Sequence, residues 1–318
     1  MDRLANDAVP LAEYADGRIC RGIVSGLAEA FVITPQQRQE IVSKICMGIK
    51  SGLAEAFVIS PQQRREIVAQ NKEAKSIIRP FVQGREIRRY SIDPVSQYLI
   101  YTHHGIDMKP YPAVLDHLRP FRDQLERRAT KQEWYELQQP QFAYVSYLEQ
   151  PKIVFPDIAT GCRFAIDTKG RFGANTVYFI PTADQALLAL LNSRLAFFYF
   201  KQTCAALEGP GEAYLRFFGQ YLEGFPVKLS TALEKDRRRL AALAQQLESL
   251  SHDHTTATTD HLKTAIQRQI AAVERQVDRL VYRLYDLTDA QIRIIEEAAT
   301  PAPEPDADEP AERNPEDG

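Results

Sequence analysis

Two long runs of apolar residues at helical spacing constrain the fold of this chain more than any other feature. Between residues 230 and 287, leucine, isoleucine and valine recur every three or four positions, at Leu240, Leu243, Leu247 and Leu250 and again at Leu262, Ile266, Ile270, Val273, Val277, Leu280 and Leu284. This period indicates two amphipathic helices. Because the polar segment Ser251–Asp260 interrupts the period, we expect an antiparallel helical hairpin of the coiled-coil type.

Short segments rich in β-branched and aromatic residues precede the helical region. Three of them, separated by Gly and polar turns, are Lys152–Ile158, Arg163–Asp167 and Thr176–Ile180. Such segments predict a small antiparallel sheet, with Asp167–Gly173 as a hairpin loop. A further strand is expected at 97–102, and helices are expected at about 111–128 and across 186–200. The expected fold class is therefore α+β.

An internal repeat occupies the N-terminal region. Residues Cys20–Ser43 match Cys46–Ala69 at 19 of 24 positions, with an offset of 26 residues. Solenoids need about three or more units, so two copies indicate a local duplication. Each copy predicts a short strand, Ala-Phe-Val-Ile, and then a helix whose N-cap is Thr34 in the first copy and Ser60 in the second.

The overall charge conceals a basic body. The net charge is -3, but residues 299–318 hold seven acids and one arginine, so the other residues sum to +3. This tail, rich in proline and acid, is expected to be disordered. Four cysteines without close spacing indicate reduced thiols. No secretory signal or membrane-length apolar run is recognised, so we expect a cytoplasmic protein without membrane contact.

Basic residues gather in the middle of the chain. Between Arg79 and Lys131 there are ten Lys or Arg and six acids, and three of the arginines, Arg85, Arg88 and Arg89, follow Gly84 within five residues. Such an excess could follow a DNA phosphate backbone, where contacts supply most of the non-specific affinity. A solvated helix face is the alternative. Trp134 is expected to pack in the fold rather than stack on a base, and Asn192 is expected to be a buried structural residue.

Catalytic patterns are weak or absent. Pro156-Asp157 followed by Asp167-Thr-Lys169 has the letters of a metal-dependent nuclease, but patterns this short occur by chance. His252 and His254 have no further ligand candidates nearby, so no metal site is expected. The sequence also contains neither a glycine-rich cofactor turn nor Asn-Pro-Pro-Tyr. No catalytic, cofactor-binding or metal-binding residue is therefore assigned, and enzymatic activity of the chain alone stays undecided.

Several blocks carry a family resemblance. In order, they are Gly52–Ile59, Ile77–Tyr90, the Leu-Asn-Ser-Arg block Leu191–Phe200, the closing segment Tyr214–Val227 and Leu280–Thr288. In this order they resemble the TaqI-like C-terminal specificity domain of adenine-specific DNA methyltransferases in type IIG restriction–modification enzymes. The resemblance implies a fragment that recognises a DNA sequence, while S-adenosylmethionine and catalysis belong to a methyltransferase domain that this sequence lacks.

The resemblance also implies a domain organisation. We expect an N-terminal segment with the first repeat copy at 1–45, a connector at 46–70, the TaqI-like target-recognition domain at 71–228, the helical hairpin at 229–298 and the acidic tail at 299–318. The expected partners are double-stranded DNA and possibly a separate methyltransferase or nuclease subunit. The residues expected to contact DNA are Arg85, Arg88, Arg89, Lys109, Arg122, Lys169 and Arg171. The alternative is a truncated remnant that binds no DNA, or a helical protein-interaction module.

Overall fold

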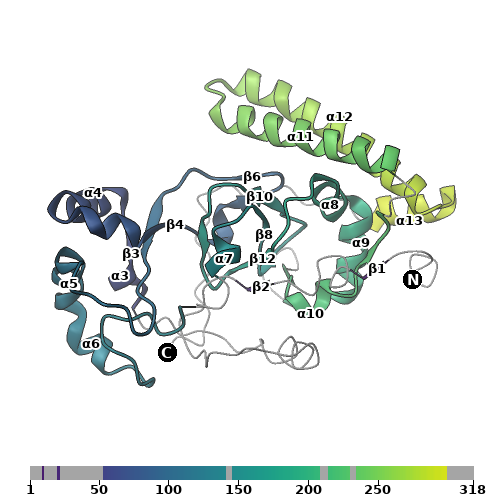
Figure 1. Cartoon of the computed structure of the whole chain (residues 1–318). Helices are drawn as coiled ribbons and strands as arrows, with labels where there is room; N and C mark the ends of the chain where they lie inside the picture. The colour runs from purple at the N-terminus through teal and green to yellow at the C-terminus, as the bar shows by residue number, and fades with distance from the viewer. Residues whose placement is uncertain are drawn as a thin grey trace.

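Two hydrophobic cores, one on each face of a central sheet, organise this protein. The computed structural model describes residues 53–140, 145–207, 214–229 and 234–298, together with the backbone of residues 9–10 and 20–21. Figure 1 shows a long helical hairpin at one end, short helices at the other and the strands between them. The predicted α+β class is confirmed, because helices and small sheets occur side by side in one chain.

The central sheet is antiparallel throughout, with strand order β10-β8-β12-β2. All five residues of β8 are buried, since Ile153 and Phe155 point into one core and Val154 into the other. A strand buried on both faces reads as a continuous apolar run, which is why this segment stands out in the sequence. The predicted small antiparallel sheet is confirmed. Its strands are β2 Cys20–Arg21, β8 Lys152–Pro156, β10 Ala165–Asp167 and β12 Val177–Ile180.

A second sheet, with strand order β11-β4-β7-β3, is mixed rather than antiparallel. Its edge strand β11 runs parallel to β4 and pairs Phe172 with Phe81. The hairpin predicted over Asp167–Gly173 is therefore wrong, because the chain leaves β10 in one sheet and joins β4 in the other instead of turning back on β10. The strands of this sheet are β3 Val58–Ile59, β4 Ile78–Val82, β7 Gln97–Ile100 and β11 Phe172–Gly173.

Three smaller pairings complete the strands. One is a three-stranded sheet of order β13-β14-β9, and the other two are the pairs β5-β6 and β1-β15. Their bounds are β1 Val9–Pro10, β5 Ile87–Arg88, β6 Ser91–Ile92, β9 Ile158–Ala159, β13 Ala206–Leu207, β14 Tyr214–Arg216 and β15 Pro226–Val227. The pair β1-β15 joins the N-terminal region to the closing segment of the TaqI-like resemblance.

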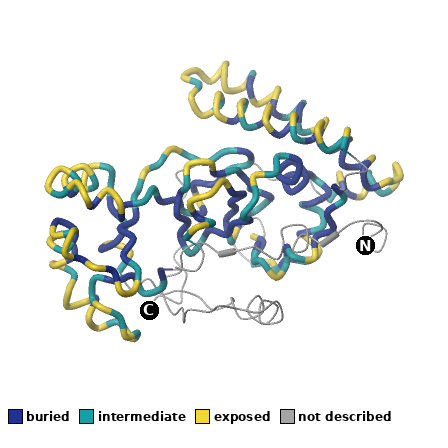
Figure 2. The backbone as a smooth tube through the Cα atoms, in the orientation of Figure 1, coloured by how far each residue is buried: buried dark blue, intermediate teal, exposed yellow. Residues whose placement is uncertain are grey.

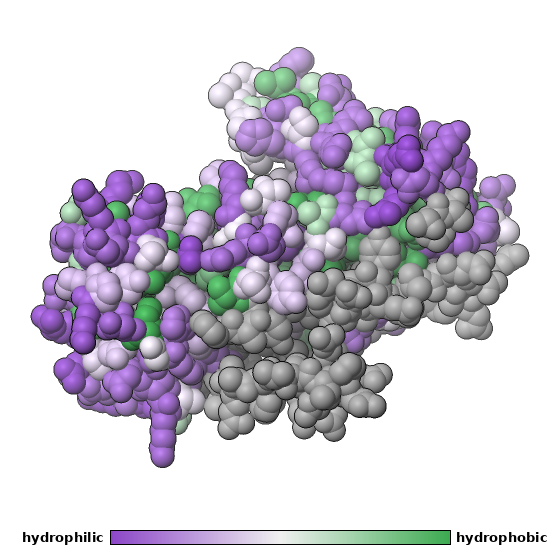
Figure 3. Space-filling view, in the orientation of Figure 1, coloured by the Kyte–Doolittle hydropathy of each residue, from purple (hydrophilic) through white to green (hydrophobic). Residues whose placement is uncertain are grey.

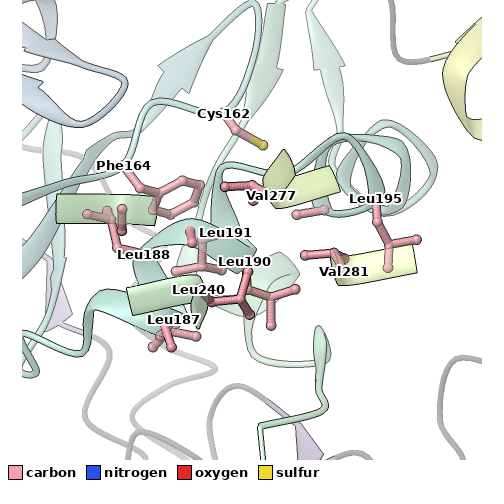
Figure 4. Close-up of a cluster of buried hydrophobic side chains, with 14 of the residues drawn as sticks. Cys162, Phe164, Leu187, Leu188, Leu190, Leu191, Leu195, Leu240, Val277 and Val281 are labelled. Atoms are coloured by element: carbon pink, nitrogen blue, oxygen red, sulfur yellow. The ribbon is translucent and has the colours of Figure 1, made fainter. Parts of the chain in front are cut away.

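The larger core lies between the central sheet and the C-terminal helices. Every residue of α8 after its first is buried, and Figure 4 shows the leucines of α8 packed with side chains of α11, α12 and the Phe164 segment. Figure 2 shows buried residues along the inner sides of these helices. The helices on this side are α8 Gln185–Leu191, α9 Arg194–Thr203, α10 Gly219–Leu222, α11 Glu234–Thr256, α12 Asp260–Leu284 and α13 Asp289–Ala298.

The predicted helical hairpin is formed by α11 and α12. Its turn is shorter than the sequence suggested, since α11 continues to Thr256 and α12 begins at Asp260. Thr259 caps the start of the second helix, because its side chain accepts a hydrogen bond from the Leu262 N–H at 3.3 Å. Such a cap satisfies one of the N–H groups that a helix leaves unpaired at its start.

Short helices cover the smaller core, and the first two of them, α3 and α4, belong to the connector at 46–70. Ser60 caps α4 as predicted, because its Oγ accepts from the Gln63 N–H at 3.1 Å while the Gln63 side chain accepts from the Ser60 N–H at 2.8 Å. The predicted strand before it is shorter, since Ala56 and Phe57 belong to a helical turn. The elements on this side are α3 Ala54–Phe57, α4 Pro61–Gln70, η2 Lys72–Ser76, η3 Gly84–Glu86, α5 Pro112–Leu118, η4 Arg119–Phe121, α6 Arg122–Glu126 and α7 Val145–Leu148.

Two helices predicted as continuous are interrupted. The helix expected over about 111–128 breaks into α5, η4 and α6 around Pro120, which has no N–H to donate to the preceding turn. The helix expected across 186–200 ends at Leu191, and Ser193 caps α9 by accepting from the Ala196 N–H at 3.2 Å. Apolar spacing missed both breaks because it continues across them.

Several expectations fall outside the described residues. They concern the Thr34 cap, the side chains of the first repeat copy and the disorder of the tail 299–318. Within the described parts, Cys162 and Cys204 are buried free thiols, as expected for reduced cysteines. Burial raises the pKa of the Cys204 thiol to about 12, so it stays protonated at neutral pH.

Candidate nucleic-acid interface

Arg85 is presented to solvent on a rigid one-turn helix, η3. The turn is closed at its base, where the Gln83 N–H donates to Glu86 Oε2 at 2.7 Å and the Ser96 hydroxyl donates to Glu86 Oε1. Glu86 itself is buried, whereas Arg85 is exposed. A cationic side chain on a backbone fixed in this way loses little backbone freedom when it meets a ligand.

Glycine is required at position 84 because the turn presses against the central sheet. The Gly84 N–H donates to Thr176 Oγ1 at 3.1 Å, and a Cβ at this position would lie 2.7 Å from the Thr176 carbonyl oxygen. Only a residue without a side chain permits this approach. Gly84 therefore determines where Arg85 stands relative to β8 and β12.

Lys169 occupies a second exposed turn, between β10 and β11. Gly170 has a φ of +62°, and a Cβ there would lie 3.2 Å from the Glu149 carbonyl oxygen, so glycine suits this bend. The Lys169 N–H donates to Asp167 Oδ1 at 3.1 Å. The side chain of Lys169 is exposed at the tip, while the base of the turn is tied to a buried carboxylate.

That carboxylate belongs to a buried charge cluster that the sequence did not reveal. Asp167 accepts from Lys152 Nζ at 2.7 Å and from the Arg171 backbone N–H at 2.7 Å, and Arg171 Nη1 lies 3.5 Å away. Lys152 Nζ also donates to the Leu148 carbonyl at 2.6 Å. Burial lowers the pKa of the Lys152 ammonium, and the neighbouring Asp167 carboxylate opposes that shift. The cluster fixes the start of the Lys169 turn.

The two exposed turns stand near opposite ends of β8. Asp167 pairs with Lys152 at the first residue of the strand, and Val177, next to Thr176, pairs with Pro156 at the last. A strand of five residues is roughly 17 Å long. Arg85 and Lys169 are therefore held apart on one scaffold rather than gathered in one cluster, and loops on a rigid sheet are common binding elements.

The cluster Arg85, Arg88 and Arg89 predicted from spacing is dispersed in the structure. Arg88 is half-buried and pairs with Asp93 at 3.2 Å. Arg89 turns inward, where it donates to the Asn192 carbonyl at 2.6 Å and pairs with Glu274 of α12 at 3.0 Å. The Glu274 carboxylate raises the pKa of the Arg89 guanidinium against the opposing effect of burial. Arg89 thus joins the segment that follows β5 to the helical hairpin.

The remaining predicted DNA-contact residues divide in the same way. Arg171 is buried in the Asp167 cluster. Lys109 is exposed in the loop before α5, and its N–H donates to Asp107 Oδ1 at 3.0 Å. Arg122 is exposed at the start of α6, pairs with Glu126 at 2.7 Å and lies over the Trp134 ring at 5.4 Å. Contact of all seven residues with DNA stays a prediction, and geometry favours the exposed ones.

Asn192 has the buried structural role expected for it. Its side chain accepts from the Phe164 N–H at 3.1 Å and donates to the Phe164 carbonyl at 2.9 Å. The Leu-Asn-Ser-Arg block therefore clamps the edge of the central sheet with Asn192, caps α9 with Ser193 and receives Arg89 on its backbone. Trp134 packs against the smaller core beside Tyr135, also as expected.

A cavity of about 450 Å³ beside the second sheet was not indicated by the sequence. Its walls are mainly apolar and include Phe57, Phe81 and Leu99. Two of the polar groups on its wall bind each other, since Gln83 Nε2 donates to Gln97 Oε1 at 2.7 Å. Arg128 is also engaged, because it donates to the Leu125 and Glu136 carbonyls.

The described parts of the chain offer neither a metal site nor a membrane-spanning helix. These parts hold no group of three or more His, Cys, Asp or Glu side chains placed to bind a metal ion. Asp167 of the nuclease-like pattern is occupied by Lys152 and Arg171. No helix within the described ranges combines the length and apolar character that a bilayer crossing requires.

Comparison with known proteins finds a matching family and a similar solved structure. Residues 79–227 match the family described as the TaqI-like C-terminal specificity domain. Among solved structures, the DNA complex of the type IIL restriction–modification enzyme MmeI is similar, with a TM-score of 0.53 and 14% sequence identity. The similarity covers 77% of this chain and 33% of MmeI, so this chain spans about a third of that enzyme. At this identity the likeness concerns the fold alone.

The matched region begins at Arg79 in β4 and ends at Val227 in β15. It contains three strands of the central sheet, β8, β10 and β12, together with both exposed turns and the Asn192 clamp. It excludes strand β2, the connector before β4 and the α11–α12 hairpin. The resemblance stated from the sequence is confirmed for this region, since residues 79–227 match the TaqI-like C-terminal specificity domain.

Proposed function

We propose that this chain recognises a specific DNA sequence as the specificity part of a restriction–modification enzyme that methylates adenine. The family match over residues 79–227 carries the proposal, since the resemblance to this family implies a specificity part of an adenine-methylating enzyme. The likeness to the MmeI fold, solved as a complex with DNA, supports it. The described surface also suits DNA binding, because Arg85 and Lys169 are exposed on turns that hydrogen bonds hold in place.

Exposed and internal cations have separate roles in the proposed complex. Arg85, Lys109 and Lys169 contact DNA, because their side chains are exposed and none forms a salt bridge with a described residue. Arg89 and Arg171 position the contacting turns from inside. Arg88 and Arg122 contribute less, since each must share its charge with a carboxylate. Phosphate contacts fix the register on the duplex, and contacts to base edges in the major groove select the sequence.

S-adenosylmethionine does not fit the described residues. Its usual domain is a doubly wound parallel sheet with a glycine-rich turn. The only parallel pairing among the described strands is β4 with β11, and the sequence contains no Asn-Pro-Pro-Tyr. We therefore assign the cofactor and the methyl transfer to a separate methyltransferase chain or domain, which acts with this chain in the cytoplasm.

The test is selection of bound fragments from a random pool of duplex DNA, followed by affinity measurements across a salt series. We expect one short motif to be enriched and the affinity for it to fall as salt rises. The variant Arg85→Gln with Lys169→Gln should reduce the slope of log affinity against log salt by about 2, since each lost phosphate contact removes about 0.9. Lys201→Gln, which removes an exposed charge from α9, serves as the control.

Failure would have a distinct appearance. If the intact chain enriches no motif and binds no duplex at low salt, the DNA-recognition proposal is wrong, and a helical protein-interaction module becomes the better description. The methylation part has its own test. Co-expression with an adenine methyltransferase from a neighbouring reading frame should add methyl groups at the enriched motif and nowhere else.

A further inference from the structure

The outer face of α12 carries four exposed arginines, Arg268, Arg275, Arg279 and Arg283. They are seven, four and four residues apart, so with 3.6 residues per turn they lie within roughly 80° around the helix. The two acids in this part of the helix point elsewhere, since Glu274 pairs with Arg89 and Asp278 is buried beside Arg194. We call these four residues the α12 arginine stripe.

Three of the four stripe arginines lack a partner among the described residues. Arg268, Arg275 and Arg279 form no hydrogen bond or salt bridge with any residue that the structure describes, and Arg283 only approaches Asp236 at 3.9 Å. By contrast, several arginines elsewhere are paired with carboxylates at about 3 Å. These pairs are Arg79–Glu149, Arg119–Asp116, Arg122–Glu126 and Arg238–Glu234.

An unpaired stripe does not serve the stability of the helix. Like charges four residues apart repel each other, and both Arg275–Arg279 and Arg279–Arg283 have this spacing. The opposite face packs α12 onto the larger core, where Ile266, Val273 and Val277 are buried. Exposed charges keep their hydration, so these arginines remain available to a partner outside the described residues.

The dimensions of the stripe suit a DNA backbone. Fifteen residues from Arg268 to Arg283 rise about 22 Å, which is the length of six or seven base pairs at about 3.4 Å each. Guanidinium groups bind phosphate in a bidentate manner. Arg239 of α11 lies beside the stripe and enlarges it, since its Nη2 donates to Gln276 Oε1 at 3.4 Å.

A lipid surface suits this face less well. A helix lying in a membrane interface exposes large apolar side chains next to its cations. The exposed large apolar residue of α12 is Leu262, at the hairpin tip and two turns before the first arginine of the stripe. Figure 3 shows that hydrophilic side chains predominate over much of the visible hairpin surface. The chemistry therefore favours phosphates of a nucleic acid.

We propose that the α12 arginine stripe is a second DNA-contacting surface, which binds phosphates beside the recognised sequence without reading bases. The inference rests on the proposed function and goes beyond it, because α12 lies outside the family match at 79–227. The ion pair between Arg89 and Glu274 links α12 to the segment that also carries Arg85.

The test compares two triple variants of the whole chain that lose the same charge. One is Arg268→Gln, Arg275→Gln and Arg279→Gln, and glutamine keeps a helix propensity close to that of arginine. The control is Lys201→Gln, Lys263→Gln and Arg293→Gln, three exposed cations away from the stripe. Affinity is measured across salt for a short duplex with only the selected motif and for a duplex extended by about one helical turn, ~10 base pairs, on each side.

We expect the stripe variant to lose affinity for the extended duplex, with the salt slope reduced by about 3 because three phosphate contacts are removed. Its selected motif and its affinity for the short duplex should stay those of the intact chain. The control should lower the slope much less. Circular dichroism should give the same helix content for all three proteins.

Two outcomes would overturn the inference while leaving sequence recognition intact. In the first, the stripe and control variants bind the extended duplex equally. In the second, the stripe variant keeps full DNA affinity but loses binding to vesicles of anionic phospholipid, which would identify a membrane contact instead. If the intact chain binds neither duplex, the proposed function has failed and this inference is overturned with it.

Discussion

Charged side chains at the central sheet and on α12 differ in burial and in pairing. In the sheet, Lys152, Asp167 and Arg171 are buried and bonded to one another. On α12, the arginine stripe is exposed, and Arg268, Arg275 and Arg279 are unpaired among the described residues. Buried charges must be matched internally because leaving water is costly, whereas exposed charges keep their hydration and remain available to a ligand. The first group should therefore control stability and the second binding.

The largest effect on stability is expected for Lys152→Met. Methionine fills a similar space but leaves the Asp167 carboxylate without its closest cation. Breaking a buried pair in this manner typically costs about 3 to 5 kcal/mol of the free energy of unfolding. Urea denaturation would measure it, with Lys169→Met as the exposed control. A loss below that of the control would mean that Asp167 is sufficiently held by Arg171 and the backbone.

The next prediction concerns Asp278, a buried carboxylate at the hairpin. Burial raises its pKa from 3.8 to about 6, while the Arg194 N–H opposes the shift. Because the folded state holds the proton more tightly, the stabilising effect of protonation is complete below pH 4 and is lost as the pH rises through 6, a change of roughly 3 kcal/mol. Asp278→Asn should lack this change and be relatively more stable at pH 7.

The measurement is the difference in free energy of unfolding between Asp278→Asn and the unmodified chain, from urea denaturation at pH 4 and at pH 7. Other carboxylates titrate in both proteins and cancel in that difference. Arg194 can still donate to the asparagine oxygen. A difference that does not vary with pH would show that the buried carboxylate is compensated by Arg194 and Arg89.

Asn192→Ala tests whether a neutral buried clamp matters as much as a buried charge. Both hydrogen bonds to the Phe164 backbone would be lost, and we expect about 2 kcal/mol of destabilisation from the polar groups left unpaired. Asn192→Asp is the matched variant, because it keeps the acceptor for the Phe164 N–H and removes the donor. Equal stability of the alanine variant and the unmodified chain would show that the two Asn192 hydrogen bonds do not stabilise the fold.

The smallest effect is expected for Arg122→Gln. Arg122 is exposed, and its pair with Glu126 is the kind of surface ion pair that contributes little to stability. The urea midpoint should not change measurably, while any loss of DNA affinity would show as a smaller salt slope. A clear shift of the midpoint would mean that the packing of Arg122 over Trp134 holds α6 in place.

Periodicity and local chemistry were sufficient for much of the fold. The period of the leucines predicted the α11–α12 hairpin, the continuous apolar runs predicted β8 and β12, and Ser60 was identified as a cap from its sequence neighbours. They failed where distant segments decide the outcome. The Asp167–Gly173 segment has the letters of a hairpin, yet β11 pairs with β4, about ninety residues earlier, because Phe172 completes the smaller core.

The site shows the same division. The sequence by itself determined that Arg85 follows a glycine and Lys169 precedes one, and that the block around Arg85 resembles part of a known specificity domain. Only the tertiary structure decided that Arg89 and Arg171 turn inward while Arg268, Arg275 and Arg279 face solvent without partners. The reason is physical: the role of a charge depends on its distance to other charges and to water, and spacing along the chain fixes neither.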